Sequence, residues 1–245
     1  MSSTEDSVVR LVNVSKSYWL DKVRVDALRD VGLEIRRSRF TVLRGPSGSG
    51  KTTLLSLIGA LDRPDQGEVI VEKRNVAQMS DQALSEFRRT RIGFIFQNFN
   101  LLPVLSVYEN VEYPLLIMRT GRAERQRRVA EVLADVGIAD QAGKRPNQLS
   151  GGQRQRVAVA RALVKQPAIV LADEPTANLD SETGRNIVSL MRQMQAKHSV
   201  SFVLSSHDPD IIAEADDVLN VHDGQVAPAS VDSIAPAHTR YHTVA

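Results

Sequence analysis

The sequence of 245 residues contains no cysteine, which excludes a disulfide framework, a thiolate metal site and thiol catalysis and fits a reducing compartment. No apolar run approaches the roughly 18 residues of a membrane-spanning helix, because stretches such as "PAIVLA" and "YPLLIM" are far too short. The first ten residues lack the charged-then-apolar pattern of a secretory signal. We therefore expect a chain that does not cross a membrane unaided.

A large excess of charge of one sign is also missing, since the formal net charge is +2. Three basic clusters nevertheless stand out, "RRSR", "RRTR" and "RAERQRR", at 36–39, 88–91 and 122–128. One interpretation is that they lie on solvated helix faces and loops; the other is that they contact anionic lipid headgroups or RNA. The first is favoured, and we expect no nucleic-acid partner.

The length allows one large domain or one domain with an inserted subdomain. Short apolar runs alternate with helical patterns, which predicts an α/β fold with a mostly parallel sheet and helices on both faces. The predicted strands are 8–14, 31–35, 40–44, 67–71, 92–96, 168–172, 201–205 and 217–221. The predicted helices are 51–61, 81–90, 107–118, 123–136, 151–164, 181–197 and a short one after Pro209.

Between about 104 and 165 the predicted helices follow one another without a strand, which indicates an all-helical insert. The residues after "DGQV" are mostly small and polar and include prolines, so we expect this tail to be loosely held. We treat residues 1–245 as a single domain with three parts. They are an α/β core with an N-terminal β subdomain (7–97 and 166–226), a helical subdomain (98–165) and a flexible tail (227–245).

A phosphate-binding loop stands between a predicted strand and an apolar helix. The motif "GPSGSGKT" has the full spacing of such a loop in the strand–loop–helix context that it requires. Its backbone N–H groups and the helix dipole attract phosphate. Lys51 is placed for the β- and γ-phosphates, and the Thr52 hydroxyl for Mg²⁺. The predicted nucleotide ligands are Gly45, Pro46, Ser47, Gly48, Ser49, Gly50, Lys51, Thr52 and Thr53.

Two adjacent carboxylates end the apolar run "IVLADE". Successive side chains of a strand point to opposite sides, so these two carboxylates are expected to do different work. Asp173 suits the shell of a magnesium ion, and Glu174 suits the polarisation of the water that attacks the γ-phosphate. The alternative is that they are acids that merely cap a strand before Pro175.

Gln97 and His207 also follow apolar runs. Taken singly, each is more often a structural residue. Ligands of parallel α/β sheets bind outside the carboxyl ends of the strands, however, and four strands would bring polar groups to that edge. His207 can donate a hydrogen bond to the γ-phosphate. Gln97 can reach Mg²⁺ or the attacking water, and it stands where the helical insert begins.

A second glycine-rich helix start is present in "LSGGQ". Ser150 and Gln153 have the spacing of a capping box, so a well-capped helix without a ligand is one interpretation. Gly151 and Gly152, however, weaken a helix by about 1 kcal/mol each relative to Ala. Bare backbone at an exposed helix N-terminus would allow close approach of an anion, which is the other interpretation.

As a set, these motifs resemble the nucleotide-binding subunit of ABC transporters, over about residues 8–226. "GPSGSGKT" resembles Walker A, Gln97 the Q-loop, "LSGGQ" the signature, "IVLADE" Walker B with its catalytic glutamate, and His207 the switch histidine. "ANLD", which ends at Asp180, resembles the D-loop. Tyr18 resembles the aromatic residue that stacks on adenine, although Trp19 could compete for that role.

The resemblance implies an ABC-type P-loop ATPase fold and an ATPase that uses ATP and Mg²⁺. Two copies would associate head to tail around two ATP molecules, so that Ser150, Gly151, Gly152 and Gln153 face the nucleotide of the other copy. The ANLD segment would couple the two sites. ATP binding would close this homodimer and hydrolysis would release it.

Within the family, "RIGFIFQNFNLLPVLSVYENVEYPL" and "LADEPTANLD" are most similar to the lipoprotein-releasing, macrolide-exporting and cell-division branch. This implies a separate transmembrane permease and peripheral association with the cytoplasmic side of a bacterial inner membrane. The segment 98–116 is the expected docking groove, in which Phe99, Leu101, Leu102 and Tyr108 either accept a permease helix or pack into the core. Alternatives are a regulatory ATPase of the cell-division type and a soluble ATPase that acts on ribosomes or DNA.

Overall fold

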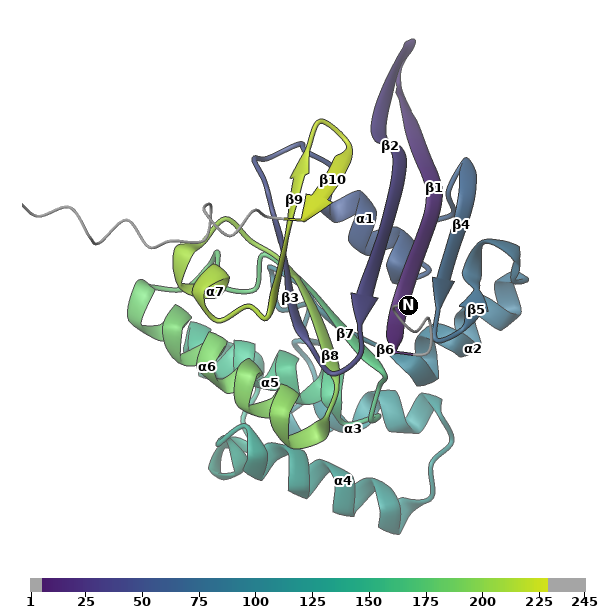
Figure 1. The fold of residues 1–245 in the computed structure, drawn as a ribbon. Helices are drawn as coiled ribbons and strands as arrows, with labels where there is room; N and C mark the ends of the chain where they lie inside the picture. Colours follow the sequence, from purple (N-terminus) through teal and green to yellow (C-terminus); the bar gives the residue numbers. More distant parts are fainter. Residues whose placement is uncertain (1–5, 229–245) are drawn as a thin grey trace, which may run out of the picture.

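The computed structural model describes residues 6–228 and contains two sheets with helices around them (Figure 1). The strands are β1 (Ser7–Leu20), β2 (Val23–Arg36), β3 (Phe40–Arg44), β4 (Gln66–Val71), β5 (Arg74–Asn75), β6 (Ile92–Ile95), β7 (Ile169–Asp173), β8 (Ser201–Ser205), β9 (Asp217–His222) and β10 (Gln225–Pro228). The α-helices are α1 (Lys51–Ile58), α2 (Asp81–Arg91), α3 (Val107–Ile117), α4 (Arg122–Asp135), α5 (Gly151–Leu163), α6 (Ser181–His198) and α7 (Pro209–Ala213).

The central sheet has the order β10-β9-β3-β8-β7-β6, and all its neighbouring pairs except β9 with β10 are parallel. Its side chains alternate between two buried clusters, as a pleated strand requires. In β7, Val170 and Ala172 pack with the helices α3 to α6, whereas Ile169 and Leu171 pack with α1 and the other sheet. The predicted α/β fold with a mostly parallel sheet is confirmed.

The second sheet is antiparallel, with the order β2-β1-β4-β5. β1 and β2 form one long hairpin whose two-residue turn is Asp21–Lys22. The two short strands predicted here were therefore too short. Burial does not mark the tip of this hairpin, because residues 18–26 are all exposed and no face of the tip packs on a core.

The helical insert contains α3, α4 and α5, and α3 packs against both of the others. In Figure 1, α3 and α4 lie below the central sheet. Ser106 caps α3 and forms a capping box with Glu109, which explains a helix start immediately after "LPVLS". Helix α1 ends at Ile58 rather than at the predicted Leu61, because Ala60 has a left-handed φ of 53° and the amides of Ala60 and Leu61 turn back to the carbonyls of Leu57 and Ser56.

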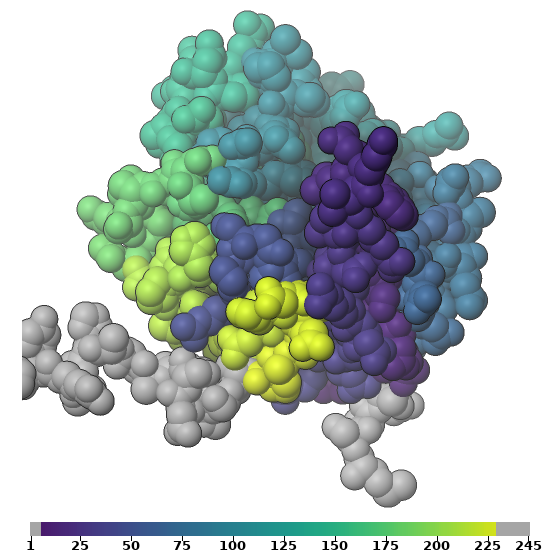
Figure 2. Space-filling view, turned by 90° about the horizontal axis from the view of Figure 1, so that it is seen from above, coloured from purple at the N-terminus to yellow at the C-terminus, as the bar shows by residue number. Residues whose placement is uncertain are grey.

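The predicted tail begins too early. Ala227 and Pro228 belong to β10, which pairs antiparallel with β9. The β9–β10 turn is fastened to the rest of the fold, because Gly224 accepts a hydrogen bond from the Arg29 amide at 2.8 Å and donates one to the Ser49 carbonyl at 3.0 Å. Figure 2 shows this hairpin in yellow against the purple strands of the antiparallel sheet. The remainder of the predicted tail lies outside the described residues.

The predicted docking residues are mostly core. Phe99 is 9% exposed, and Leu101 and Tyr108 pack against the cluster of the helical insert, so that the core-packing interpretation holds for these three. Leu102 is 38% exposed. The segment is thus anchored by its aromatic residues and presents other side chains outward.

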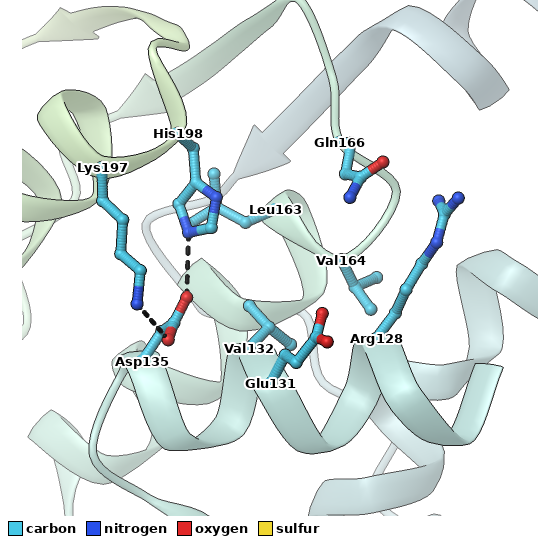
Figure 3. A pocket seen from close by; sticks show the side chains of 9 residues that line it. All are labelled: Arg128, Glu131, Val132, Asp135, Leu163, Val164, Gln166, Lys197 and His198. Atoms are coloured by element: carbon cyan, nitrogen blue, oxygen red, sulfur yellow. Dashed lines mark hydrogen bonds and ion pairs between the residues drawn. The ribbon is translucent and has the colours of Figure 1, made fainter. Parts of the chain in front are cut away.

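A cavity lies between α4, the end of α5 and the end of α6 (Figure 3). At its margin Asp135 of α4 accepts hydrogen bonds from Lys197 at 2.7 Å and from Nε2 of His198 at 3.0 Å. These contacts tie the helical insert to the core at a place lined by none of the predicted site residues.

Among the described residues, no helix is both long enough and apolar enough to span a bilayer.

Candidate nucleotide site

Four neighbouring parallel strands, β3, β8, β7 and β6, end at one edge of the central sheet. The residues that follow or end them are Gly45, His207, Asp173 and Gln97, in that spatial order. The strand-end prediction is therefore confirmed for the backbone positions. The sheet brings together segments that lie far apart in the sequence, which is the usual way in which a parallel sheet builds a ligand site.

The loop from Gly45 to Gly50 needs its glycines for close approach and for backbone conformation. A Cβ on Gly45 would stand 2.0 Å from the carbonyl oxygen of Val221. Gly50 has φ of 110°, and its Cβ would stand 2.5 Å from the Ala27 carbonyl oxygen. Because a side chain fits at neither position, this loop keeps its backbone bare where α1 begins.

Lys51 is the first residue of α1 and is only 8% exposed. Its ammonium donates hydrogen bonds to the carbonyls of Gly45 at 2.7 Å and Pro46 at 3.0 Å, so it lies across the loop rather than in solvent. Ser49 is buried, with a side-chain oxygen that has no hydrogen-bond partner. The loop thus combines a fixed cation with the N-terminus of a helix, which is an arrangement suited to phosphate.

Asp173, Thr52 and Ser205 form one hydrogen-bonded group. The Thr52 hydroxyl lies 3.1 Å from Oδ2 of Asp173, and the Ser205 hydroxyl donates to Oδ1 at 2.5 Å. Asp173 and Ser205 are register partners on β7 and β8. The sequence analysis did not include Ser205, although the strand-end rule applied to "SFVLS" would have found it.

Glu174 differs from Asp173 for a reason other than strand alternation. Strand β7 ends at Asp173, and Glu174 has a left-handed φ of 44°. The alternation of side chains along a strand therefore does not determine where Glu174 points. Its amide donates to the Ser205 hydroxyl at 3.0 Å. Its Oε1 lies 3.3 Å from Nδ1 of His207, whose side chain is 78% exposed. The carboxylate is thus held at the sheet edge beside an imidazole.

The Gln97 side chain is exposed, and what the fold holds is its backbone. The Asn178 amide, from the ANLD segment, donates to the Gln97 carbonyl at 2.9 Å and to the Asn98 side chain at 3.0 Å. Arg161 of α5 donates to the carbonyls of Phe99 and Asn100. The segment after β6 is therefore fastened both to the ANLD segment and to α5. The sequence analysis singled out the ANLD segment, which contains Asn178, but not its contact with the Gln97 carbonyl, and it did not consider Arg161.

The LSGGQ helix start is capped as predicted. The Ser150 hydroxyl accepts a hydrogen bond from the Gln153 amide at 3.2 Å, and the Gln153 side chain accepts one from the Ser150 amide at 2.9 Å. Asp180 caps α6 in the same way, through the Thr183 amide at 2.9 Å, and this bond contributes most to lowering the pKa of Asp180. The two capping residues, Ser150 and Asp180, are exposed, whereas Gly151 and Gly152 of α5 are half-buried.

Gly151 and Gly152 of this motif are required by packing within the chain itself. A Cβ on Gly152 would stand 2.6 Å from Cγ2 of Thr183, and one on Gly151 would stand 3.1 Å from Cδ2 of Leu179. The sequence analysis explained the bare backbone by close approach of an anion. The fold adds the close approach of α5 to the start of α6.

This packing predicts that Gly152→Ala destabilises the protein. Forcing a methyl group against a β-branched side chain costs about 1–3 kcal/mol, of which better helix propensity offsets up to about 1 kcal/mol. Gly151→Ala should cost less, because the Leu179 side chain can rotate away. Urea denaturation measures the difference, and Thr183→Ser, which deletes Cγ2, should restore the stability of Gly152→Ala. A Gly152→Ala variant with the wild-type midpoint would contradict this account.

Tyr18 lies near the tip of the β1–β2 hairpin and is 38% exposed, whereas Trp19 is 70% exposed. The Tyr18 hydroxyl donates to Oδ2 of Asp62 at 2.8 Å. Burial and then this hydrogen bond raise the pKa of Tyr18. Asp62, which the sequence analysis did not consider, follows α1, so the aromatic ring is linked to the helix that the phosphate loop begins.

The family of the chain follows from comparison with known proteins. The model of the ABC transporter family matches residues 28–177, from within β2 to the ANLD segment. The chain belongs to this family. It is an ABC-type ATPase, the ATP-binding component of an ABC transporter. This agrees with the resemblance found in the motifs and with the architecture described above.

Relatives of this ABC ATPase are similar over nearly the whole of the chain. An uncharacterised ABC transporter ATP-binding protein of Thermotoga maritima is 45% identical over 89% of this chain and 93% of its own length. An ATP-binding cassette of Methanocaldococcus jannaschii, solved as a dimer in a post-hydrolysis state with ADP and Pi, is 40% identical with a TM-score of 0.83. That match covers 91% of this chain and 98% of the other.

A macrolide export ATP-binding/permease protein of Salmonella choleraesuis is 40% identical over 90% of this ABC ATPase. The match covers only 34% of the relative, because ATPase and permease are joined in that protein.

Proposed function

We propose that this ABC ATPase works as a pair of copies that hydrolyse ATP between them and move a separate permease, for export or for extraction of a substrate from the membrane. The observation that carries the proposal is the gathering of the phosphate loop, Asp173, Glu174 and His207 at one edge of the sheet. The capped start of α5 in LSGGQ, with its exposed Ser150, is the part that each copy would supply to the reaction site of the other copy.

The phosphate loop binds the triphosphate. Its backbone N–H groups and the N-terminus of α1 supply donors, and the buried Lys51 ammonium exchanges the Gly45 and Pro46 carbonyls for phosphate oxygens. A cation held in place before the nucleotide arrives loses little side-chain entropy on binding. Tyr18 supplies an aromatic face for the base.

The residues at the edge fit Mg²⁺ in part. Thr52 and Asp173 bring two oxygen donors to 3.1 Å from each other, and Gln97 follows the neighbouring strand. Among the described residues, no group of three His, Cys, Asp or Glu side chains could hold a metal by itself. This suits Mg²⁺, which takes one or two protein ligands and completes its shell with phosphate oxygens and water. When bound, the ion neutralises charge on the transferred phosphoryl group.

Glu174 is the proposed general base. Its backbone is held by Ser205 in a left-handed conformation, so its carboxylate has a defined direction beside His207. The carboxylate orients the attacking water and accepts its proton. His207, whose ring is largely exposed at the edge, donates a hydrogen bond to the γ-phosphate and so stabilises the charge that the transition state spreads over its oxygens.

The LSGGQ start acts on the nucleotide of the other copy. The Ser150 oxygen accepts a hydrogen bond from the Gln153 amide, which leaves its hydroxyl proton available to a phosphate oxygen. The free N–H groups at the start of α5 add donors. Only ATP supplies the γ-phosphate, so ATP favours the closed pair and ADP does not, and Asp180 and Asn178 link the two sites.

The permease would dock on the side chains that the helical insert presents outward. Exposed apolar residues gather on α3 and on the segment before it: Leu102, Val104, Tyr113, Leu116 and Ile117. A short amphipathic permease helix fits such a surface. Through this contact the ATPase would lie peripherally at the cytoplasmic face of a bacterial inner membrane. Related macrolide and pyoverdine export proteins carry both parts in one chain, which supports an export role.

A regulatory role of the cell-division type would use the same docking surface. A ribosome- or DNA-bound ATPase is disfavoured, because the basic clusters are largely neutralised within the chain. Arg36 and Arg39 bind Asp217, Arg37 and Arg91 bind Glu72, and Arg127 and Arg128 bind Glu124.

The test is co-purification of the tagged ATPase from solubilised membranes. We expect a membrane protein with an extracytoplasmic domain to come down with the wild type and to be lost with Leu116→Glu, while ATP hydrolysis by the purified subunit is unchanged. Val23→Glu is the matched control, since Val23 is an exposed apolar residue of the distant hairpin. Retention of the membrane protein by Leu116→Glu would contradict the docking surface, and recovery of ribosomal proteins in its place would contradict the function.

A further inference from the structure

A hydrogen-bonded group of three side chains fixes the ring of Tyr18. Asp62 is at its centre. Its Oδ2 accepts the Tyr18 hydroxyl at 2.8 Å, and its Oδ1 accepts the Lys16 ammonium at 2.9 Å and the Arg63 amide at 2.7 Å. Burial acts to raise the pKa of Asp62, but these hydrogen bonds outweigh it and leave the pKa lowered. The carboxylate is therefore ionised and fully engaged at neutral pH.

Lys16 makes the second contact with the ring. Its ammonium lies 5.2 Å from the centroid of the Tyr18 ring and also donates to the Arg63 carbonyl at 2.7 Å. The Lys16 side chain is 11% exposed, so it is packed rather than free in solvent. A cation over an aromatic face within about 6 Å is attracted to it. The Lys16 ammonium thereby covers one face of the ring. Tyr18 is nevertheless 38% exposed, so part of the ring remains accessible.

Trp19 has none of this support. It is 70% exposed, and as the next residue of β1 it points to the opposite side of the strand. Asp62, in contrast, follows α1, whose first residue is Lys51. The Tyr18 hydroxyl is therefore joined to the segment after α1 through the Asp62 carboxylate, and it also interacts with the side chain of Thr53 in the first turn of α1.

We propose that Asp62 and Lys16 are positioning residues for the adenine base: they hold the Tyr18 ring in one orientation, at a fixed distance from the phosphate loop, with its open face ready for stacking. The inference rests on the proposed nucleotide site and deepens it. A ring already ordered in the free protein does not lose its freedom when the base binds, and that saved entropy appears as affinity. The carboxylate never touches the nucleotide.

The experiment measures two dissociation constants, for ATP and for inorganic tripolyphosphate, on purified full-length variants. Tyr18→Phe keeps the ring and deletes the hydroxyl, and Asp62→Ala deletes its acceptor. Each should weaken ATP binding by about three- to tenfold, the factor expected for ordering one side chain. Tripolyphosphate has no base, so its binding should be unchanged. The double variant should lose less affinity for ATP than the sum of the two single losses, because both variants break the contact between Tyr18 and Asp62.

Asp26→Ala is the matched control. Asp26 is a carboxylate of the same hairpin that bonds Ser17 and Arg24 but not Tyr18, and it should leave both constants at the wild-type value. Equal loss for ATP and tripolyphosphate, or additive losses in the double variant, would overturn the inference in favour of a general structural role. If Asp62→Ala does not fold, Tyr18→Phe alone decides between these outcomes. Wild-type ATP binding by Lys51→Ala would instead overturn the nucleotide site itself.

Discussion

Replacing Glu174 with Gln is expected to reduce ATP turnover to a small fraction of the wild-type rate, while ATP still binds. Gln keeps the size of the side chain and its hydrogen-bonding oxygen but cannot accept the proton of the attacking water. A positioned general base contributes about 10²–10⁴-fold to a rate, which is the loss we expect in kcat. Because ATP binds and is not consumed, this variant should accumulate as a closed dimer. Phosphate release measures turnover, and sedimentation velocity with ATP measures the dimer.

Glu214→Gln is the control for this variant. Glu214 is an exposed carboxylate at the end of α7 and should leave turnover unchanged. If Glu174→Gln hydrolyses ATP at the wild-type rate, another group accepts the proton and the role given to Glu174 is wrong. The nearby His207 would be the first group to examine, since its ring lies 3.3 Å from the carboxylate.

Replacing Lys51 with Ala is expected to act earlier, on binding. The loss of a charge-assisted hydrogen bond to phosphate costs about 1.5–3 kcal/mol, which corresponds to an increase of about 10- to 100-fold in the Kd for ATP. Turnover at low ATP should fall in proportion. Titration with a fluorescent ATP analogue measures the Kd. In this variant, unlike Glu174→Gln, no ATP-dependent dimer should form at moderate nucleotide concentration.

The Lys51 ammonium also bonds two carbonyls of its own loop, so folding must be checked beside binding. An unchanged thermal unfolding midpoint with a raised Kd supports the account. Lys73→Ala, at an exposed lysine, controls for the loss of one positive charge. A Lys51→Ala variant that binds ATP as the wild type does would show that the phosphate loop is held for structural reasons only.

The sequence predicted the fold and most of the site because its signals were local. "GPSGSGKT" between a strand and a helix requires one backbone arrangement, and Ser150 with Gln153 specifies one capping box. Apolar runs bounded by polar residues located the strands of the central sheet. Because parallel strands end together, the edge that collects Gln97, Asp173 and His207 followed from their positions alone.

Pairing partners distant in sequence could not be predicted in the same way. Asn178 bonds the Gln97 carbonyl and Asp62 bonds Tyr18, and each of these contacts joins two segments that meet only in the folded protein. The direction of the Glu174 side chain could not be predicted either, because no residue type in the sequence indicates that a non-glycine residue has a left-handed φ. Strand β10 was missed because Pro228 and the small residues around it are typical of a loop.

The dependence of ATP turnover on protein concentration tests the central claim most directly, namely that one copy carries only half of each reaction site. Steady-state phosphate release would be followed at saturating ATP over about a hundredfold dilution, with sedimentation to locate the range in which the protein is monomeric. The account predicts that the rate per copy falls in proportion to concentration in that range. A rate per copy that stays constant when every molecule is alone would contradict it.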